Sequence, residues 1–161
     1  MTYFTITKRY LRVVGFSLFL MLTSMQVHAE SGFVLTDISG KQQRLEDFKG
    51  KWVLVNYWAT WCPPCLEEVP DLVSLYDQRK DKDLVVLGIA LDYKSKDDVV
   101  KFVDDMLMSY PIVLGNEKII QQVGPADVLP TTYIYNPQGK LVKTKHGAVT
   151  KEYVEKIINA K

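Results

Sequence analysis

Residues 55–65 read VNYWATWCPPC and hold both cysteines of the chain. They overlap the end of an apolar run, residues 52–59, which is rich in β-formers and has the pattern of a strand buried on both faces. After the cysteines the apolar residues fall at helical spacing, which predicts a helix from about Pro63 to about Gln78. The sequence therefore places a Cys-x-x-Cys pair between a buried strand and the start of a helix.

A Cys-x-x-Cys pair has several ordinary uses. Haem attachment requires His directly after the second Cys, and here Leu66 follows. A structural zinc site requires four ligands, but after residue 29 the chain offers no further Cys and one His, His146. Thiol–disulfide exchange fits the context, because the start of a helix stabilises a thiolate. The alternative is an inert disulfide, whose small loop would constrain the unfolded chain little.

Strands alternate with helices outside this motif, and a hairpin closes the pattern. This order predicts a mixed α/β sheet covered on both faces. No repeat, linker or low-complexity tract divides residues 30–161, so we expect one domain there. The further predicted strands are 33–37, 42–45, 84–91, 112–114, 131–135 and 140–143, and the further helices are 97–108, 117–123 and a last one capped by Thr150.

The N-terminal residues have the order of a secretory signal peptide. Basic Lys8, Arg9 and Arg12 precede the mostly apolar residues 13–25, and small Ala29 follows. We expect residues 1–29 to be a signal peptide cleaved after Ala29. The alternative is an uncleaved anchor, although a spanning helix needs about 20 apolar residues. Either outcome exports the domain to a compartment where disulfides persist.

The charge balance gives no sign of a nucleic-acid partner. The 161 residues include 20 Lys and Arg against 19 Asp and Glu, so no basic excess exists. Hydrophobic residues make up 47%, which excludes a disordered or collagen-like chain.

Two segments together carry a resemblance to a known family. Residues 55–65, followed by Glu68 and Pro70, and the later segment Leu129-Pro130-Thr131-Thr132-Tyr133 resemble the thioredoxin fold. More narrowly they resemble the exported TlpA/ResA/CcmG-type thiol–disulfide oxidoreductases. The resemblance covers residues 33–161 and implies a thioredoxin-like mixed sheet flanked by helices, with an N-terminal hairpin and an extra strand-helix insertion at about 97–123.

The resemblance also implies roles for individual residues. Cys62 would be the attacking, partly exposed thiolate and Cys65 the resolving thiol, and together they would form a redox-active disulfide. Pro130 would be cis and pack against the dithiol. The residues that would form an apolar rim for the substrate chain are Trp61, Pro63 and Leu129, whose backbone would pair with that chain.

Glu68 lies three residues after Cys65, on the same helix face. A carboxylate there can raise a thiol pKa and shuttle its proton, which is the role that the resemblance implies. The alternative is a solvated first-turn glutamate, which is what we expect of Glu67. Asn56 stands where thioredoxin carries a buried Asp, so a proton route through that position is missing; alternatively it is a strand amide satisfied by neighbours. We expect His146 to be a surface or loop residue.

These features predict an exported protein-disulfide reductase of the periplasm or the extracytoplasmic face of the membrane. By resemblance, its partners would be disulfide-containing envelope proteins, for example apocytochrome c in cytochrome c biogenesis, and a membrane electron donor of the DsbD/CcdA type. We expect no cofactor, no metal and no nucleic acid. The alternatives are a thiol oxidant or isomerase, which a proline-bracketed helix start that lowers the Cys62 pKa would favour, and a chain-binding module without turnover. A peroxidase is disfavoured because no Pro-x-x-x-Thr-x-x-Cys arrangement is present.

Overall fold

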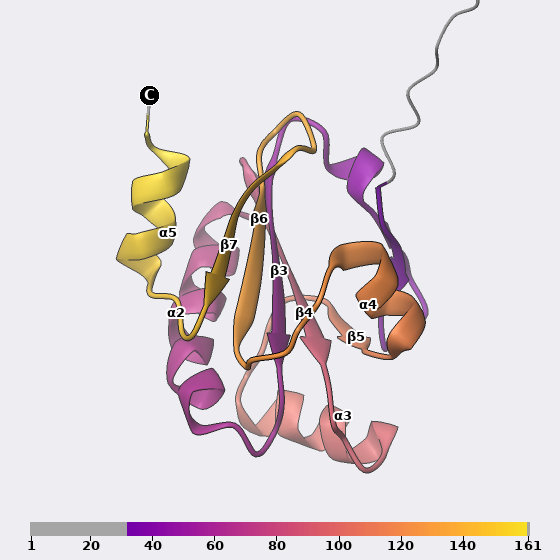
Figure 1. Ribbon diagram of the computed structural model, residues 1–161. Helices are drawn as coiled ribbons and strands as arrows, with labels where there is room; N and C mark the ends of the chain where they lie inside the picture. Colours follow the sequence, from indigo (N-terminus) through magenta and orange to yellow (C-terminus); the bar gives the residue numbers. More distant parts are fainter. Residues whose placement is uncertain (1–31, 161) are drawn as a thin grey trace, which may run out of the picture. The chain divides into compact units, whose positions relative to one another are not determined.

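The computed structural model describes residues 32–160, which form a five-stranded sheet, a two-stranded sheet and flanking helices (Figure 1). The predicted signal peptide, residues 1–29, lies outside the described residues. Within residues 32–160 no helix has the length and apolar character that a membrane span requires. The strands are β1 (Val34–Thr36), β2 (Gln42–Arg44), β3 (Trp52–Trp58), β4 (Leu84–Ala90), β5 (Ile112–Leu114), β6 (Thr131–Tyr135) and β7 (Leu141–His146). The helices are the 3-10 helix η1 (Leu45–Phe48), α2 (Pro63–Arg79), α3 (Lys96–Asp105), α4 (Glu117–Val123) and α5 (Lys151–Ile158).

The large sheet is mixed and has the strand order β5-β4-β3-β6-β7. Strand β3 lies at its centre, where it pairs in parallel with β4 and antiparallel with β6. Apart from Asn56, β3 is apolar throughout, because both of its edges are paired and both of its faces are covered. Strands β1 and β2 form a separate antiparallel hairpin. The predicted mixed sheet and N-terminal hairpin are confirmed.

Two hydrophobic clusters lie on opposite faces of the large sheet. One cluster joins the sheet to α2, α3 and α5 and includes Cys62 and Cys65. The other joins the sheet to the β1–β2 hairpin, η1 and α4. Figure 1 shows α2 and α5 on one side of the strands and α4 on the other. Cys62 and Cys65 therefore belong to the hydrophobic core on the side of the sheet that α2 covers.

Helix α3 ends earlier than its apolar pattern predicts. The predicted stripe runs to Leu107, but Leu107 is 78% exposed and has a left-handed φ of 53°. The Met108 N–H bonds to the Val103 carbonyl, and the Leu107 N–H bonds to the Asp104 carbonyl. This is the Schellman arrangement, which usually has glycine at the left-handed position. The prediction for Leu107 was wrong because the helix ends without that glycine signal, and Met108 turns inward instead.

Candidate active site

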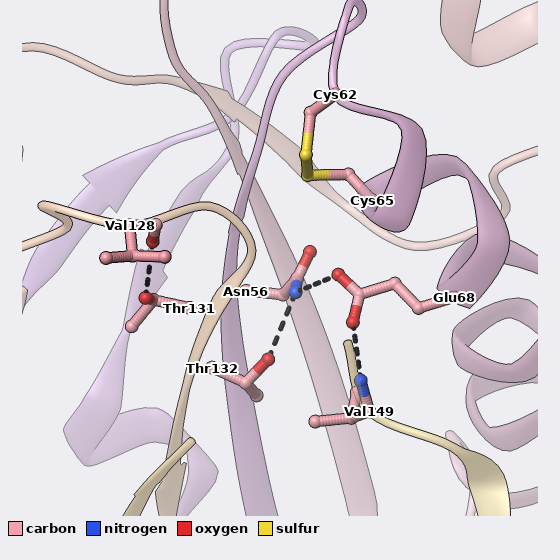
Figure 2. Close-up of a disulfide and its surroundings, with 8 residues drawn as sticks. All are labelled: Asn56, Cys62, Cys65, Glu68, Val128, Thr131, Thr132 and Val149. Carbon is pink, nitrogen blue, oxygen red and sulfur yellow. Dashed lines mark hydrogen bonds between the residues drawn. A yellow bond between two sulfur atoms is a disulfide. The ribbon is translucent and has the colours of Figure 1, made fainter. Parts of the chain in front are cut away.

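Cys62 and Cys65 form a disulfide at the start of α2 (Figure 2). Cys62 is the N-cap residue of this helix, and its carbonyl accepts hydrogen bonds from the N–H groups of Cys65 (3.0 Å) and Leu66 (3.2 Å). The resemblance implied a partly exposed Cys62. In the disulfide form, however, Cys62 is only 3% exposed and Cys65 is 0% exposed. Cys62 is therefore the more accessible of the two, although its bond to Cys65 holds it against the core.

Two prolines occupy the first turn of α2. Pro63 and Pro64 stand at the first two helical positions, and neither has an N–H group. An N-cap side chain normally accepts from the N–H of the second or third helical residue. Pro64 removes the first of these donors, so a thiolate on Cys62 would have fewer hydrogen bonds than at an ordinary helix start. Pro64 thus works against the thiolate stabilisation that was expected of a proline-bracketed helix start and that would favour an oxidant.

Glu68 is buried one turn further along α2. Only 2% of it is exposed, so the alternative of a solvated glutamate is wrong, while Glu67 is exposed as predicted. Its Oε1 accepts from Asn56 Nδ2 at 2.7 Å, and its Oε2 accepts from the Val149 N–H at 2.8 Å. Burial raises the pKa of Glu68 to about 7, and these two hydrogen bonds and the charge of Lys145 oppose the rise. Close to neutral pH, this carboxyl group can both accept and release a proton.

Asn56 links Glu68 to strand β6. Its Nδ2 donates to Glu68 and also, at 3.1 Å, to Thr132 Oγ1 (Figure 2). The Asn56 amide is thus satisfied by its neighbours, as one of the two alternatives for it predicted, and one of these neighbours is the candidate acid Glu68. Sequence reasoning missed Thr132 and the Val149 N–H as partners of this group. No local sequence pattern could have signalled them, because Thr132 lies 76 residues from Asn56 and Val149 lies 81 residues from Glu68.

The segment before β6 holds the predicted cis-proline. The Leu129–Pro130 peptide bond is cis, as the resemblance implied, and Pro130 is buried. Leu129 is half-buried and packs against both hydrophobic clusters, one of which contains the cysteines. Exposed apolar surface lies in this segment at Val128 (54% exposed), which sequence reasoning missed, and before the dithiol at Trp61 (60% exposed). Pro63 is also exposed.

His146 ends strand β7 and is exposed, as expected. It lies opposite Thr131 in the β6–β7 register, and its Nδ1 is 3.0 Å from Thr131 Oγ1. Over residues 32–160, no three His, Cys, Asp or Glu side chains gather into a group that could hold a metal ion.

Known proteins are similar to this chain in sequence and in architecture. Residues 28–144 match the AhpC/TSA family. The thiol-disulfide oxidoreductase ResA of Bacillus cereus is 36% identical over 151 residues, which cover 90% of this chain and 86% of that protein. A thiol:disulfide interchange protein of the thioredoxin family from Chlorobium tepidum is 25% identical, with a TM-score of 0.71 over 79% of this chain and 90% of that one. An exposed lipoprotein thioredoxin from Streptococcus pneumoniae is 29% identical, with a TM-score of 0.66 over 79% of this chain and 97% of that one.

The matched relatives and the geometry agree on one chemistry. The match to ResA spans most of both chains, and this chain carries the Cys62–Cys65 pair at a helix start. The chain therefore belongs to the AhpC/TSA family, and within it to the ResA-like thiol–disulfide oxidoreductases with a thioredoxin fold.

Proposed function

We propose that the protein is an extracytoplasmic disulfide reductase in which Cys62 attacks, Cys65 resolves and Glu68 carries a proton. The observation that carries the proposal is the placement of a disulfide-forming pair one helical turn from a buried carboxyl group with a pKa of about 7. A thiol that must lose its proton at neutral pH is served best by a base whose pKa lies near that pH.

The reaction balances as a two-electron transfer to the substrate. The Cys62 thiolate attacks one sulfur of the substrate disulfide, a mixed disulfide forms, and the first substrate thiolate leaves. Glu68 takes the proton of the Cys65 thiol, and the resulting thiolate attacks the Cys62 sulfur. The second substrate thiolate then leaves and is protonated. The protein ends with the Cys62–Cys65 disulfide and must be reduced again by a donor.

The direction of transfer is supported by Pro64, the second of the two prolines in the first turn. A dithiol is a strong oxidant when its reduced form is stabilised. Pro64 denies the Cys62 thiolate one of the two N–H donors that an N-cap side chain normally uses. A less stabilised thiolate favours the disulfide in the protein, and therefore reduction of the substrate.

The surface around the dithiol supports an extended peptide as substrate. Trp61, Pro63 and Val128 offer exposed apolar contacts. Within residues 32–160, neither the N–H nor the carbonyl of Leu129 has a hydrogen-bond partner, so both are free to pair with a substrate backbone. A peptide that adds to this segment would present its disulfide to Cys62.

The finer parts of the proposal concern place and partners. Residues 1–29 would be a signal peptide that exports a domain of residues 30–161, and one related solved structure is an exposed lipoprotein. The substrates would be disulfide-containing envelope proteins, apocytochrome c among them. A membrane electron donor of the DsbD/CcdA type would regenerate the dithiol.

The test combines a reduction potential with trapping of the mixed disulfide. In thiol–disulfide buffers, a potential near or below about −270 mV supports the reductase, whereas a value near −120 mV contradicts it and indicates an oxidant. The Cys65→Ala variant should accumulate a mixed disulfide with a disulfide-bonded protein, and Cys62→Ala should accumulate none. A Cys62→Ala variant that still reduces the substrate would overturn the assignment of Cys62 as the attacking residue.

A further inference from the structure

The segment that leads to Pro130, residues 124–130, is held at both ends by hydrogen bonds. At its start, the hydroxyl groups of Tyr57 and Tyr133 donate to the carbonyls of Gly124 (3.2 Å) and Pro125 (2.7 Å). At its end, the Gly147 N–H donates to the Pro130 carbonyl at 2.8 Å. Between these points lie the exposed Val128 and the backbone of Leu129 that is free of internal hydrogen bonds among the described residues.

Two hydrogen bonds in series, from His146 to Thr131 and from Thr131 to Val128, hold the segment at a third point. Thr131 Oγ1 lies 2.6 Å from the Val128 carbonyl and 3.0 Å from His146 Nδ1 (the first contact is drawn in Figure 2). A carbonyl oxygen only accepts, so the single hydroxyl hydrogen of Thr131 must point to Val128. The hydroxyl oxygen is then left to accept, and His146 must donate through Nδ1–H. Donor counting thus gives one direction for the whole chain, from His146 through Thr131 to Val128.

We propose that His146 and Thr131 are positioning residues for the substrate-binding segment, and this rests on the proposed reductase function. The two residues face each other in the β6–β7 register, so the sheet itself sets their spacing. Thr131 is fully buried and the Val128 carbonyl has its one described partner in the Thr131 hydroxyl. By orienting that carbonyl, these hydrogen bonds also orient the Leu129 N–H, which lies in the same planar peptide unit, toward the substrate.

The geometry makes a prediction about the imidazole that does not depend on turnover. In its neutral form, His146 should carry its proton on Nδ1, which is the minor tautomer of a free imidazole in water. Two-dimensional ¹H–¹⁵N correlation of the ring nitrogens distinguishes the two tautomers directly. In the Thr131→Val variant, which keeps the branched shape but lacks the hydroxyl, the Nδ1–H preference should disappear. A neutral His146 protonated on Nε2 in the unsubstituted protein would overturn the proposal.

The functional consequence is a change in substrate binding rather than in chemistry. With insulin disulfides as the probe and dithiothreitol as the reductant, His146→Leu and Thr131→Val should raise KM about 2- to 10-fold, the effect of one lost hydrogen bond, with kcat within twofold. His146→Asn restores an N–H donor near the position of Nδ1, and Thr131→Ser restores the hydroxyl, so both variants should have a KM close to that of the unsubstituted protein. Thr144 lies on β7, the strand that also carries His146, and Thr144→Val is the matched control, which should leave KM unchanged.

The outcomes separate this proposal from the proposed function. If the unsubstituted protein does not reduce insulin at all, the reductase function fails, and the tautomer measurement still decides the direction of the hydrogen bonds. If the protein reduces insulin but His146→Leu and Thr131→Val have the KM of Thr144→Val, the positioning role is refuted. The positioning role would also be refuted if His146→Leu and Thr131→Val raised KM and lowered kcat and the unfolding free energy together, and if Thr131→Ser and His146→Asn did not reverse these changes.

Discussion

Asn56 Nδ2 lies 2.7 Å from Glu68 Oε1, and both side chains are buried, with 1% and 2% of their surface exposed. An amide donor directed at a carboxylate favours the ionised form, while burial favours the neutral form. The balance leaves the pKa of Glu68 at about 7, which is where a proton carrier for thiol chemistry is most useful. Asn56 is thereby a regulator of Glu68 although it cannot itself exchange a proton.

Replacing Asn56 by leucine should raise the pKa of Glu68 above 7. The variant removes a donor that stabilises the carboxylate and keeps the desolvation that opposes it. The pH at half-titration can be measured from the ¹³C shift of the Glu68 carboxyl group. Thr132→Val serves as the control, because it removes the other partner of Asn56 and leaves the contact with Glu68 intact. An unchanged or lower pKa in Asn56→Leu would show that the amide does not stabilise the charge.

Glu68 should make the stability of the folded domain fall with rising pH. Its pKa lies near 4.5 when exposed and about 7 when folded, so between these values the folded chain holds a proton that the unfolded chain has lost. The stabilisation is fully present below pH 4.5 and is lost as the pH rises through 7, which amounts to about 3 kcal/mol. In urea unfolding from pH 4 to pH 8, Glu68→Gln should flatten this slope, and the exposed control Glu67→Gln should preserve it. Equal slopes in all three proteins would contradict the assignment.

Replacing Pro64 by alanine should make the dithiol more oxidising. Alanine restores the N–H of the second helical residue, and one hydrogen bond to a charged group contributes about 1.5–3 kcal/mol. At about 30 mV for each 1.4 kcal/mol, the potential should rise by about 30–60 mV in thiol–disulfide buffers. Pro63→Ala is the matched control, since the first helical N–H does not cap the N-cap side chain. Equal shifts in both variants would show that loss of proline rigidity, and not the restored donor, sets the potential.

Gly124 should tolerate alanine much less than Gly40 does. Both glycines have positive φ, but a Cβ on Gly124 would approach Tyr133 Oη to 2.6 Å, whereas a Cβ on Gly40 meets nothing within 4 Å. Gly124→Ala must therefore displace the tyrosine that fastens the Pro125 carbonyl, and it should lose about 1–3 kcal/mol more unfolding free energy than Gly40→Ala. Chemical denaturation of the two variants measures the difference. Similar losses would show that backbone strain alone determines the effect.

Most of the architecture could be predicted from local patterns. The nearly unbroken apolar run predicts β3, the switch to helical spacing predicts α2, and Thr150 caps α5 by accepting from the Tyr153 N–H. The end of α3 could not be predicted, because Leu107 adopts a conformation for which glycine is the usual signal.

The partners of the candidate site depended on long-range contacts. Glu68 meets Asn56 at a sequence separation of 12 and Val149 at a separation of 81, so no local pattern reports its burial. His146 is exposed, as predicted, but its contact with Thr131 could not be predicted, because that contact exists only in the final β6–β7 register. The chemistry of Cys62 and Cys65 was visible in one short motif, whereas the groups that adjust it come from four separate segments.

Residues 146–149 touch the site at three points, through the His146 side chain, the Gly147 N–H and the Val149 N–H. The first two hold the segment around Pro130, and the third holds the Glu68 carboxylate. An insertion or deletion within this connection would displace all three at once, whereas the turn at the other end of β7, residues 136–140, touches none of them. Among homologous sequences, gaps should therefore accumulate in that turn and be purged from residues 146–149, even where the side chains themselves diverge.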